Sequence, residues 1–216
     1  MCGRFNVIDS PGLQQLLQDL GIDLKLPSKA NIAPTEAVPL VREGEFGREL
    51  SAAHWWLTPS WAPSVDQKYS MFNARSETIA TSNTFRGSFR HKRCLIPVSG
   101  FYEWTGQKGS KTPFAIGLRN RRWFCFAGLW DRATIDGSEI DSFTILTTEP
   151  NDLMAGLHTR MPVILDPQDY ERWLDTSSRD VEDLYEPFPT DAMHAWAVAP
   201  AVGNVRNQGP ELIEEV

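Results

Sequence analysis

The apolar residues near the N-terminus have helical spacing. Ser10-Pro11 is followed by Leu13, Leu16, Leu17 and Leu20, and then by Gly21. These residues supply an N-cap, a proline in the first turn, an apolar stripe along one face and a residue that ends a helix. The pattern predicts an amphipathic helix of about three turns.

From Val38 to Phe143 the apolar runs are short or alternate with polar residues, and Gly, Pro and Asn separate them. Such runs are typical of strands in one continuous sheet system. We expect strands at residues 38–42, 49–57, 93–98, 112–118, 122–130 and 142–148. The stretch from Gly106 to Lys111 predicts a hairpin loop, and Asp136-Gly137 predicts another turn.

In the remaining third of the chain, the residue pattern predicts short helices. A second helix begins at Asp166-Pro167 and continues through Leu174, and a looser acidic segment runs from Asp180 to Asp191. No repeat or low-complexity linker divides the 216 residues. We therefore predict one α+β domain, residues 1–216, of mainly antiparallel strands curled into an open barrel-like sheet with short peripheral helices.

Composition narrows the class of protein. The chain has no run of about 18 apolar residues, so no membrane span is expected, and no secretion signal is expected either. We predict a cytoplasmic protein without a membrane partner. Three cysteines without CxxC spacing argue against a disulfide framework and a zinc site, so no metal or cofactor is expected. Cys94 and Cys125 lie in apolar runs and are expected in the core.

The net charge of −7 is unevenly distributed along the chain. Residues 161–216 hold 12 acidic and 3 basic residues, whereas residues 1–160 hold 16 acidic and 18 basic ones. Basic clusters occur at Arg86–Arg93 and Arg119–Arg122. Phosphate binding depends on local lysine and arginine, so the acidic total does not exclude a nucleic-acid partner. A solvated charged loop explains each cluster equally well.

Cys2 follows the initiator methionine directly. If Met1 is removed, Cys2 carries a thiol and a free α-amine on adjacent carbons. This 1,2-aminothiol condenses with aldehydes, because the amine forms an imine and the sulfur closes a thiazolidine ring. An α-amine has a typical pKa of about 7.7–8.0, against about 10.4 for lysine, so a nucleophile is available near neutral pH. The alternative is a chance cysteine in a disordered tail.

Three polar residues stand in unexpected surroundings: Asn73 follows an apolar pair, Glu103 lies among three aromatic residues, and His158 precedes a strand-like run. Each alone fits an ordinary role, as a turn residue, a surface charge or a loop imidazole. Together with Cys2 they offer what imine chemistry needs. A carboxylate can exchange protons, an imidazole titrates near neutrality, and an amide can position the amine. Arg4 and Arg75 offer phosphate contacts nearby.

Six segments resemble those of the SRAP family, the SOS-response-associated peptidases. They occur in order from residue 2 to about residue 213, so the resemblance covers nearly the whole chain. The segments are Met1–Phe5, Asn31–Thr35, Phe72–Thr78, Pro97–Trp104, His158–Pro162 and Val202–Asn207.

The resemblance implies a shield for abasic sites in single-stranded DNA, including sites at junctions with duplex. The processed N-terminal Cys2 would form a thiazolidine crosslink with the aldehyde of the ring-opened sugar. Asn73 would position the α-amine and the sugar, Glu103 would exchange protons in ring closure, and His158 would protonate the sugar oxygen. The protein would act as a monomer, associated with the nucleoid when bound to DNA.

The resemblance also implies DNA-binding residues. The expected set is Arg4, Arg75 and Arg160 on phosphates, Pro34 and Trp61 against bases, and Thr147 on the strand. Two positions depart from the family pattern. Thr84 is smaller than the residue expected to pack against DNA, and the loop at residues 59–63 has one aromatic residue where two are common.

Two other functions remain open from the sequence. A cysteine-type peptidase or autopeptidase would use Cys2, Glu103 and His158 for acyl transfer. A non-covalent binding module for single-stranded nucleic acid would use Trp61, Arg75 and the basic cluster at residues 86–93. No GxSxG, HExxH or Walker motif competes with these readings.

Overall fold

Five strands close into a barrel in the computed structural model, which describes residues 2–66, 68–107 and 109–216. The strands are β3 (Ala37–Gly44), β4 (Gly47–Trp55), β6 (Arg93–Val98), β9 (Phe124–Ile135) and β10 (Ser138–Thr148). The ring runs β10-β4-β3-β6-β9 and returns to β10, because β9 and β10 also pair with each other. The predicted barrel-like sheet is confirmed, but it is closed rather than open.

The β9–β10 hairpin is what closes the ring. It pairs from Ser138↔Ile135 to Ile145↔Gly128, around a turn at Asp136-Gly137 in which both residues have positive φ. The predicted turn is therefore confirmed. Both strands extend toward the turn beyond their predicted bounds, because the arms next to the turn alternate buried or half-buried residues with exposed ones and show no apolar run. On its other edge, β10 pairs in parallel with β4, at Phe143↔Trp55.

A second sheet lies against one side of the barrel. Its order is β13 (Met193–Ala197), β8 (Thr112–Leu118), β7 (Gly100–Thr105), β1 (Phe5–Val7) and β2 (Lys29–Ile32), and all its pairings are antiparallel. One face of it joins the barrel core: the rings of Phe5 and Trp55 are 4.9 Å apart, and those of Phe101 and Phe126 are 5.7 Å apart. β1 is therefore fixed between barrel and sheet, which places the N-terminus.

The predicted first helix is confirmed as α1 (Pro11–Asp19). The Ser10 side chain accepts a hydrogen bond from the Leu13 amide at 3.2 Å, and Leu13, Leu16 and Leu17 are buried. The second predicted helix consists of η2 (Pro167–Asp169) and α4 (Tyr170–Leu174). The expectation of buried Cys94 and Cys125 is also confirmed, since both are fully buried.

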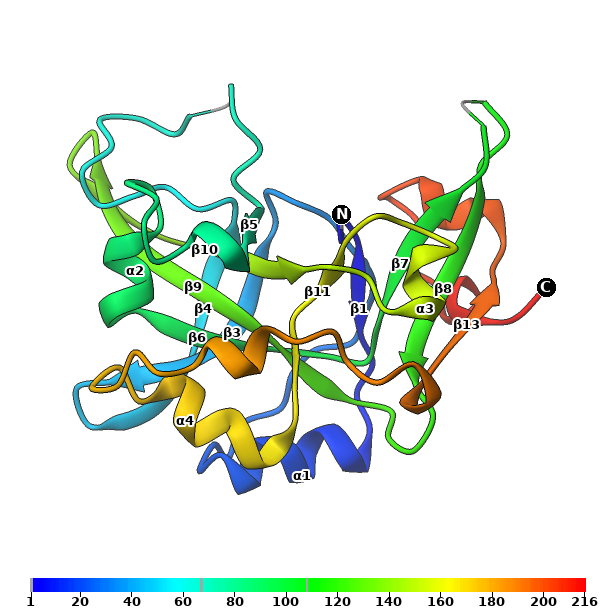
Figure 1. Ribbon diagram of the computed structural model, residues 1–216, viewed down its shortest axis with the longest axis horizontal. Helices are drawn as coiled ribbons and strands as arrows, with labels where there is room; N and C mark the ends of the chain where they lie inside the picture. Colours follow the sequence, from blue (N-terminus) through cyan, green and yellow to red (C-terminus); the bar gives the residue numbers. More distant parts are fainter. Residues whose placement is uncertain (1, 67, 108) are drawn as a thin grey trace.

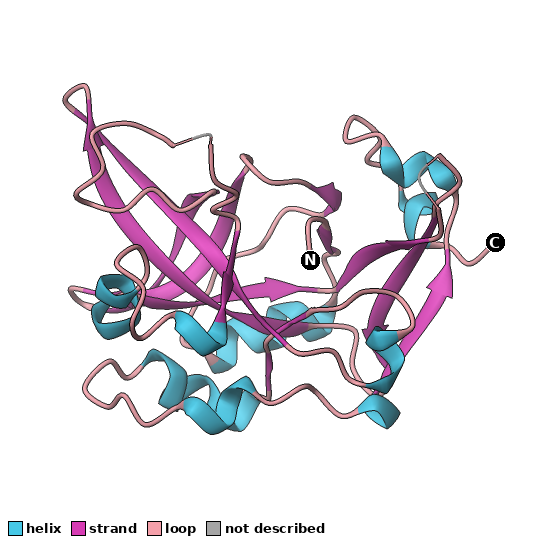
Figure 2. Ribbon diagram, turned by 45° about the horizontal axis from the view of Figure 1, so that its top comes forward, coloured by secondary structure: helices cyan, strands magenta, loops and turns pink. Residues whose placement is uncertain are grey.

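Short elements fill the connections and lie around the strands in Figure 2. They are β5 (Asn73–Arg75), η1 (Ser76–Thr78), α2 (Arg86–His91), α3 (Asp152–Ala155), β11 (Met161–Pro162), β12 (Ile164–Leu165), η3 (Glu182–Tyr185), η4 (Thr190–Ala192), η5 (Pro200–Gly203) and η6 (Pro210–Ile213). Among the described residues, no helix has the length and apolar character needed to span a membrane.

The charge asymmetry of the sequence has a spatial counterpart. Figure 1 shows the N-terminus in the upper half of the view, whereas α4 and the acidic segment after it lie in the lower half. Some of that acidity is neutralised locally, as in the ion pair of Arg172 with Asp183. This acidic segment therefore does not crowd the end of β1 at which Cys2 lies.

Candidate active site

Cys2 is part of the packed structure. It precedes β1, and its side chain is fully buried. The chain at this point is held by β7, because the Tyr102 amide donates to the carbonyl of Arg4 at 2.9 Å and Phe5 pairs with Phe101. The Sγ atom lies 3.9 Å from the Arg4 carbonyl oxygen. The alternative of a chance cysteine in a loose tail does not fit this arrangement.

Asn73 contacts Cys2 directly. It begins β5, which pairs in parallel with β10 at Ile145, and its Nδ2 donates to the Cys2 carbonyl at 2.8 Å. Its Oδ1 is buried and has no hydrogen-bond partner among the residues that the structure describes. A buried acceptor without a donor costs stability, and such an atom is often kept for a ligand or a reacting group. Here it is free to accept an N–H or O–H that arrives beside Cys2.

Glu103 approaches Cys2 from β7. It is 4% exposed, and it lies on the same face of the strand as Phe101, which points into the core. Burial first, and the Glu103 charge second, raise the pKa of the Cys2 thiol. The thiol is thus protonated at neutral pH, with a carboxylate nearby to take its proton.

His158 lies on the loop after α3. Its amide donates to the carbonyl of Met154 at 2.7 Å, and its Nδ1 accepts from the amide of Arg160 at 3.0 Å. Because Nδ1 is an acceptor, the neutral imidazole carries its proton on Nε2. Arg160 in turn binds the carbonyl of Thr147, which lies opposite Arg75. His158 therefore belongs to the segment beside β5, on the side of the site that Asn73 occupies.

Arg4 binds other groups of the protein, and these contacts hold the N-terminal segment in place. Its Nη1 donates to Asn31 Oδ1 at 2.7 Å and to the carbonyl of Val202 at 2.9 Å. Asn31 Nδ2 donates to the same Val202 carbonyl at 3.0 Å and to those of Asn204 and Asn207. Two of the motifs found in the sequence, around Asn31 and at 202–207, therefore hold the start of β1 in place. The phosphate contact predicted for Arg4 remains a prediction.

The other predicted phosphate ligands differ in availability. Arg75 is exposed and forms no ion pair with a described residue. Arg160, by contrast, binds both carboxylate oxygens of Glu77, one of them at 2.9 Å, and holds the pKa of Glu77 below its usual range. A phosphate would have to displace Glu77 to reach it. The DNA contact predicted for Thr147 does not fit its environment, because Thr147 is fully buried and its hydroxyl donates to the carbonyl of Ala74.

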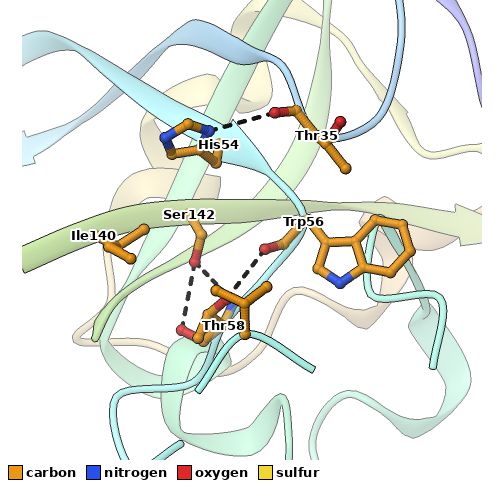
Figure 3. A pocket seen from close by; sticks show the side chains of 7 residues that line it. Thr35, His54, Trp56, Thr58, Ile140 and Ser142 are labelled. Carbon is orange, nitrogen blue, oxygen red and sulfur yellow. Dashed lines mark hydrogen bonds between the residues drawn. The ribbon is translucent and has the colours of Figure 1, made fainter. Parts of the chain in front are cut away.

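A hollow on the barrel surface lies next to Pro34, the half-buried residue expected against a base. It has a volume of about 650 Å³ and is lined by Thr35, His54, Trp56, Thr58, Val65, Ile140 and Ser142. Figure 3 shows His54 turned toward the carbonyl of Thr35, at 3.4 Å. No pattern in the sequence indicates this hollow, because its walls come from three separate segments that only the barrel brings together.

Trp61 lies on the same long loop as Trp56 and is 67% exposed, as expected. The loop is closed at its base by the Leu57 amide, which donates to the carbonyl of Met71 at 3.1 Å. It therefore returns to the barrel two residues before Asn73, so an exposed aromatic ring and the Cys2 site share one segment of chain.

Known proteins are similar to this chain in sequence and in fold. Residues 1–205 match the family described as SOS response associated peptidase (SRAP). The chain belongs to the SRAP family. Abasic site processing protein YoqW of Bacillus subtilis (strain 168) is 35% identical over 99% of each chain, and abasic site processing protein YedK of Escherichia coli (strain K12) is 29% identical over 100% of each. A crystal structure of a protein from Bacteroides thetaiotaomicron covers 98% of each chain with a TM-score of 0.82 at 24% identity, which shows a common fold.

The first basic cluster of this SRAP chain is only partly available to a ligand. Lys92 forms an ion pair with Asp131, and the buried Arg93 donates to the carbonyls of Asp175 and Ser178. Arg86 and Arg90 remain exposed on α2. The cluster of basic residues in the sequence is therefore larger than the positive surface in the structure, because two of its residues bind other groups of the protein.

Proposed function

We propose that this protein processes abasic sites in single-stranded DNA by capturing the sugar aldehyde covalently at Cys2, after Met1 has been removed. The observation that carries the proposal is the contact of Asn73 with the Cys2 carbonyl, which holds the N-terminal residue beside a buried carboxylate. The names of the relatives YoqW and YedK, both abasic site processing proteins, support the same substrate.

The reaction joins an aldehyde and an aminothiol with loss of one water. The Cys2 α-amine attacks C1′ of the ring-opened deoxyribose, and the resulting carbinolamine loses water to give an imine. The sulfur then adds to the imine carbon, and the thiol proton moves to the nitrogen. The product is a thiazolidine that contains the α-amine nitrogen, the sulfur and the former aldehyde carbon.

Each of the other three residues has one task in this scheme. Asn73 holds the Cys2 backbone through Nδ2 and offers its unpartnered Oδ1 to the α-amine. Glu103 takes the proton of the thiol as the carbon–sulfur bond forms and returns it to the nitrogen. His158 donates a proton to the ring oxygen of the sugar, which favours opening to the aldehyde.

The state of the thiol favours aldehyde capture over a cysteine peptidase. A peptidase needs a thiolate, which proteins obtain by lowering the pKa of the cysteine. Burial and Glu103 do the opposite for Cys2. In aldehyde capture the amine attacks first, so the thiol can stay protonated until the imine has formed.

The DNA strand would cross the surface where Arg75 and Trp61 are exposed. Arg75 lies two residues after Asn73 on the same strand, so both side chains leave the same face. Base stacking on an exposed aromatic ring contributes roughly 1–3 kcal/mol per base. Pro34 and the hollow beside it would take a neighbouring base, while Arg4 and Arg160 would add phosphate contacts.

Intact mass spectrometry tests the proposal directly. The purified protein is measured before and after incubation with a short single-stranded oligonucleotide that carries one abasic site. We expect a protein without Met1, and a single adduct whose mass is the sum of both partners less one water. An unchanged protein mass, or an adduct with an undamaged oligonucleotide, would contradict the proposal.

Glu103→Gln and His158→Ala are expected to slow crosslinking by about 10- to 10⁴-fold, because each removes a proton-transfer group but leaves Cys2 intact. Single-turnover rates on abasic DNA give the measurement. The affinity for undamaged single-stranded DNA should stay unchanged in both variants, which separates chemistry from binding. Wild-type rates in both would remove these residues from the mechanism.

Arg75→Ala is expected to weaken binding of single-stranded DNA and to reduce the slope of log affinity against log salt by about 0.7, the value for one phosphate contact. Arg179→Ala is the matched control, because Arg179 is also exposed but lies in the acidic C-terminal part. Fluorescence anisotropy at several salt concentrations measures both. An equal loss in the two variants would indicate a general effect of charge and no specific contact.

A further inference from the structure

The outer face of the second sheet carries a cavity of about 540 Å³ that the crosslinking chemistry does not use. Its floor is a row of residues across four strands. Asn6 pairs with Gly100, and Gly117 pairs with His194. Gly100 and Gly117 are neighbours on adjacent strands, one position beyond the pair Phe101↔Ile116. The middle of the floor is therefore two glycines side by side.

Paired glycines in the interior of a sheet weaken it, and they often mark a place where another group approaches the backbone closely. On the rest of this face, the C-terminal segment covers the sheet with Val202 and Leu212, which pack with Tyr102 and Ala115. That cover leaves the cavity beside the glycine row, where the groups that approach the backbone are the rings of His194 and Trp196, next to Gly117. Both glycines are buried, because the rings of His194 and Trp196 lie against Gly117 and the Asn6 side chain lies beside Gly100.

One wall of the cavity is aromatic. The rings of His194 and Trp196 stack with centroids 4.6 Å apart at an interplanar angle of 16°. Trp196 is fixed by its Nε1, which donates to the carbonyl of Ile213 at 2.8 Å. Burial, and next the charge of Arg119, lower the pKa of His194, so its ring is neutral at physiological pH, and its buried Nδ1 has no hydrogen-bond partner among the described residues.

The rim is cationic. Arg119, Arg121 and Arg122 line the cavity from the connection between β8 and β9. Arg121 is paired with Asp166, whereas Arg119 and Arg122 are exposed and form no ion pair within the described part of the chain. The opposite rim holds Asp9 and Ser10, at the N-terminal end of α1. One Asp9 oxygen accepts a hydrogen bond from Gln14 Nε2, and the carboxylate can also accept from a hydroxyl or amino group of a ligand.

We propose that this cavity binds a nucleotide. The phosphate is held by Arg119 and Arg122, and the planar base stacks against the His194–Trp196 pair. An aromatic pair beside two exposed arginines matches a ligand that joins a ring to a phosphate, and the volume lies in the range of about 300–1,000 Å³ usual for small-ligand sites. Free nucleotides and the nucleotide units of a strand share this chemistry.

This cavity is separate from the Cys2 site. Figure 1 shows the N-terminus at the upper end of β1, and the connection between β8 and β9, which carries the arginines, at the lower right, below the end of β8. The proposal therefore does not depend on crosslinking, and each can fail without the other. It also gives a role to the second basic cluster, which the capture of an abasic site leaves unused.

The test is a titration of the full-length protein with deoxyadenosine monophosphate, followed by calorimetry and by the indole ¹H–¹⁵N signal of Trp196. Deoxyadenosine and inorganic phosphate serve as half-ligands, and each is expected to bind at least about 10-fold more weakly than the nucleotide. The Arg119→Ala/Arg122→Ala variant should lose about 10-fold or more in affinity. The matched control Arg86→Ala/Arg90→Ala, which removes two exposed arginines from α2, should bind as the wild type does.

Competition then distinguishes the two sources of nucleotide. An undamaged oligonucleotide and further, unlabelled mononucleotide are compared as competitors for the bound mononucleotide. If the oligonucleotide competes at the lower concentration, the site takes part of a strand; if it does not, the site takes free nucleotides. Both outcomes support a nucleotide site. No saturable binding, an unmoved Trp196 signal, or equal affinity in the Arg119→Ala/Arg122→Ala variant would overturn the proposal. Melting temperatures of both double variants show that the comparison is between folded proteins.

Discussion

The Cys2→Ser variant will form no adduct with abasic single-stranded DNA that survives heating in detergent. Serine keeps the α-amine, so the imine can still form, but the hydroxyl oxygen cannot supply the carbon–sulfur bond that completes the thiazolidine. An imine hydrolyses on denaturation. We therefore expect no heat-stable product above the background of the assay. A denaturing gel with labelled oligonucleotide measures this loss.

Borohydride provides the internal control for this variant. It reduces the imine to a secondary amine, so the Cys2→Ser protein should regain a stable adduct when the reductant is present during the reaction. Cys125→Ala is the matched cysteine control, because Cys125 is another fully buried thiol, on β9 opposite Leu165, and has no part in the scheme. It should crosslink at the wild-type level. A full-strength, heat-stable adduct of Cys2→Ser without reductant would show that the sulfur is not required.

The sequence predicted the strands of ordinary length well, but it predicted the shortest strands poorly and missed the ends of the longest two. The strands at 93–98 and 112–118 match β6 and β8 at both ends, because each is an apolar run of ordinary length. β1 and β5 have 3 residues each, too few to show any period, and each includes a polar site residue or lies next to one. What holds these two strands is their pairing with β7 and β10, and pairing partners cannot be read from local spacing.

The candidate site also has features that the sequence could predict and features that it could not. Asn73 and Cys2 are 71 positions apart, and nothing in their local patterns indicates that they meet; the resemblance to the SRAP family supplied that expectation. The sequence could not show which of the candidate side chains are buried or already paired within the protein. Arg160 and Thr147 were expected on the DNA, yet one is paired with Glu77 and the other is enclosed between β5 and β11. The polar residues of a motif can position a site as well as contact a ligand.

Formylation of the Cys2 α-amine will abolish crosslinking in proportion to the fraction of protein modified. The amine is the first nucleophile of the scheme, and a formyl amide nitrogen cannot form an imine. The formylation is selective for the α-amine because this amine has a lower pKa than lysine. An α-amine of pKa about 7.7–8.0 reacts near neutral pH, while the lysine amine, with a pKa of about 10.4, stays protonated. Formyl groups that reach the sulfur first move to the adjacent nitrogen through a five-membered ring, which leaves the thiol free.

This modification also separates aldehyde capture from a cysteine peptidase, because an acyl transfer uses the thiol and needs no α-amine. Intact mass gives the fraction formylated, and the same sample is assayed for the abasic-DNA adduct and for cleavage of a generic peptide substrate. Loss of the adduct alongside unchanged binding of undamaged DNA is the expected result. If the formylated protein still formed the adduct, the α-amine would have no part in the reaction. Removal of Met1 would then carry no consequence for function, and the role of Asn73 at the Cys2 backbone would need another explanation.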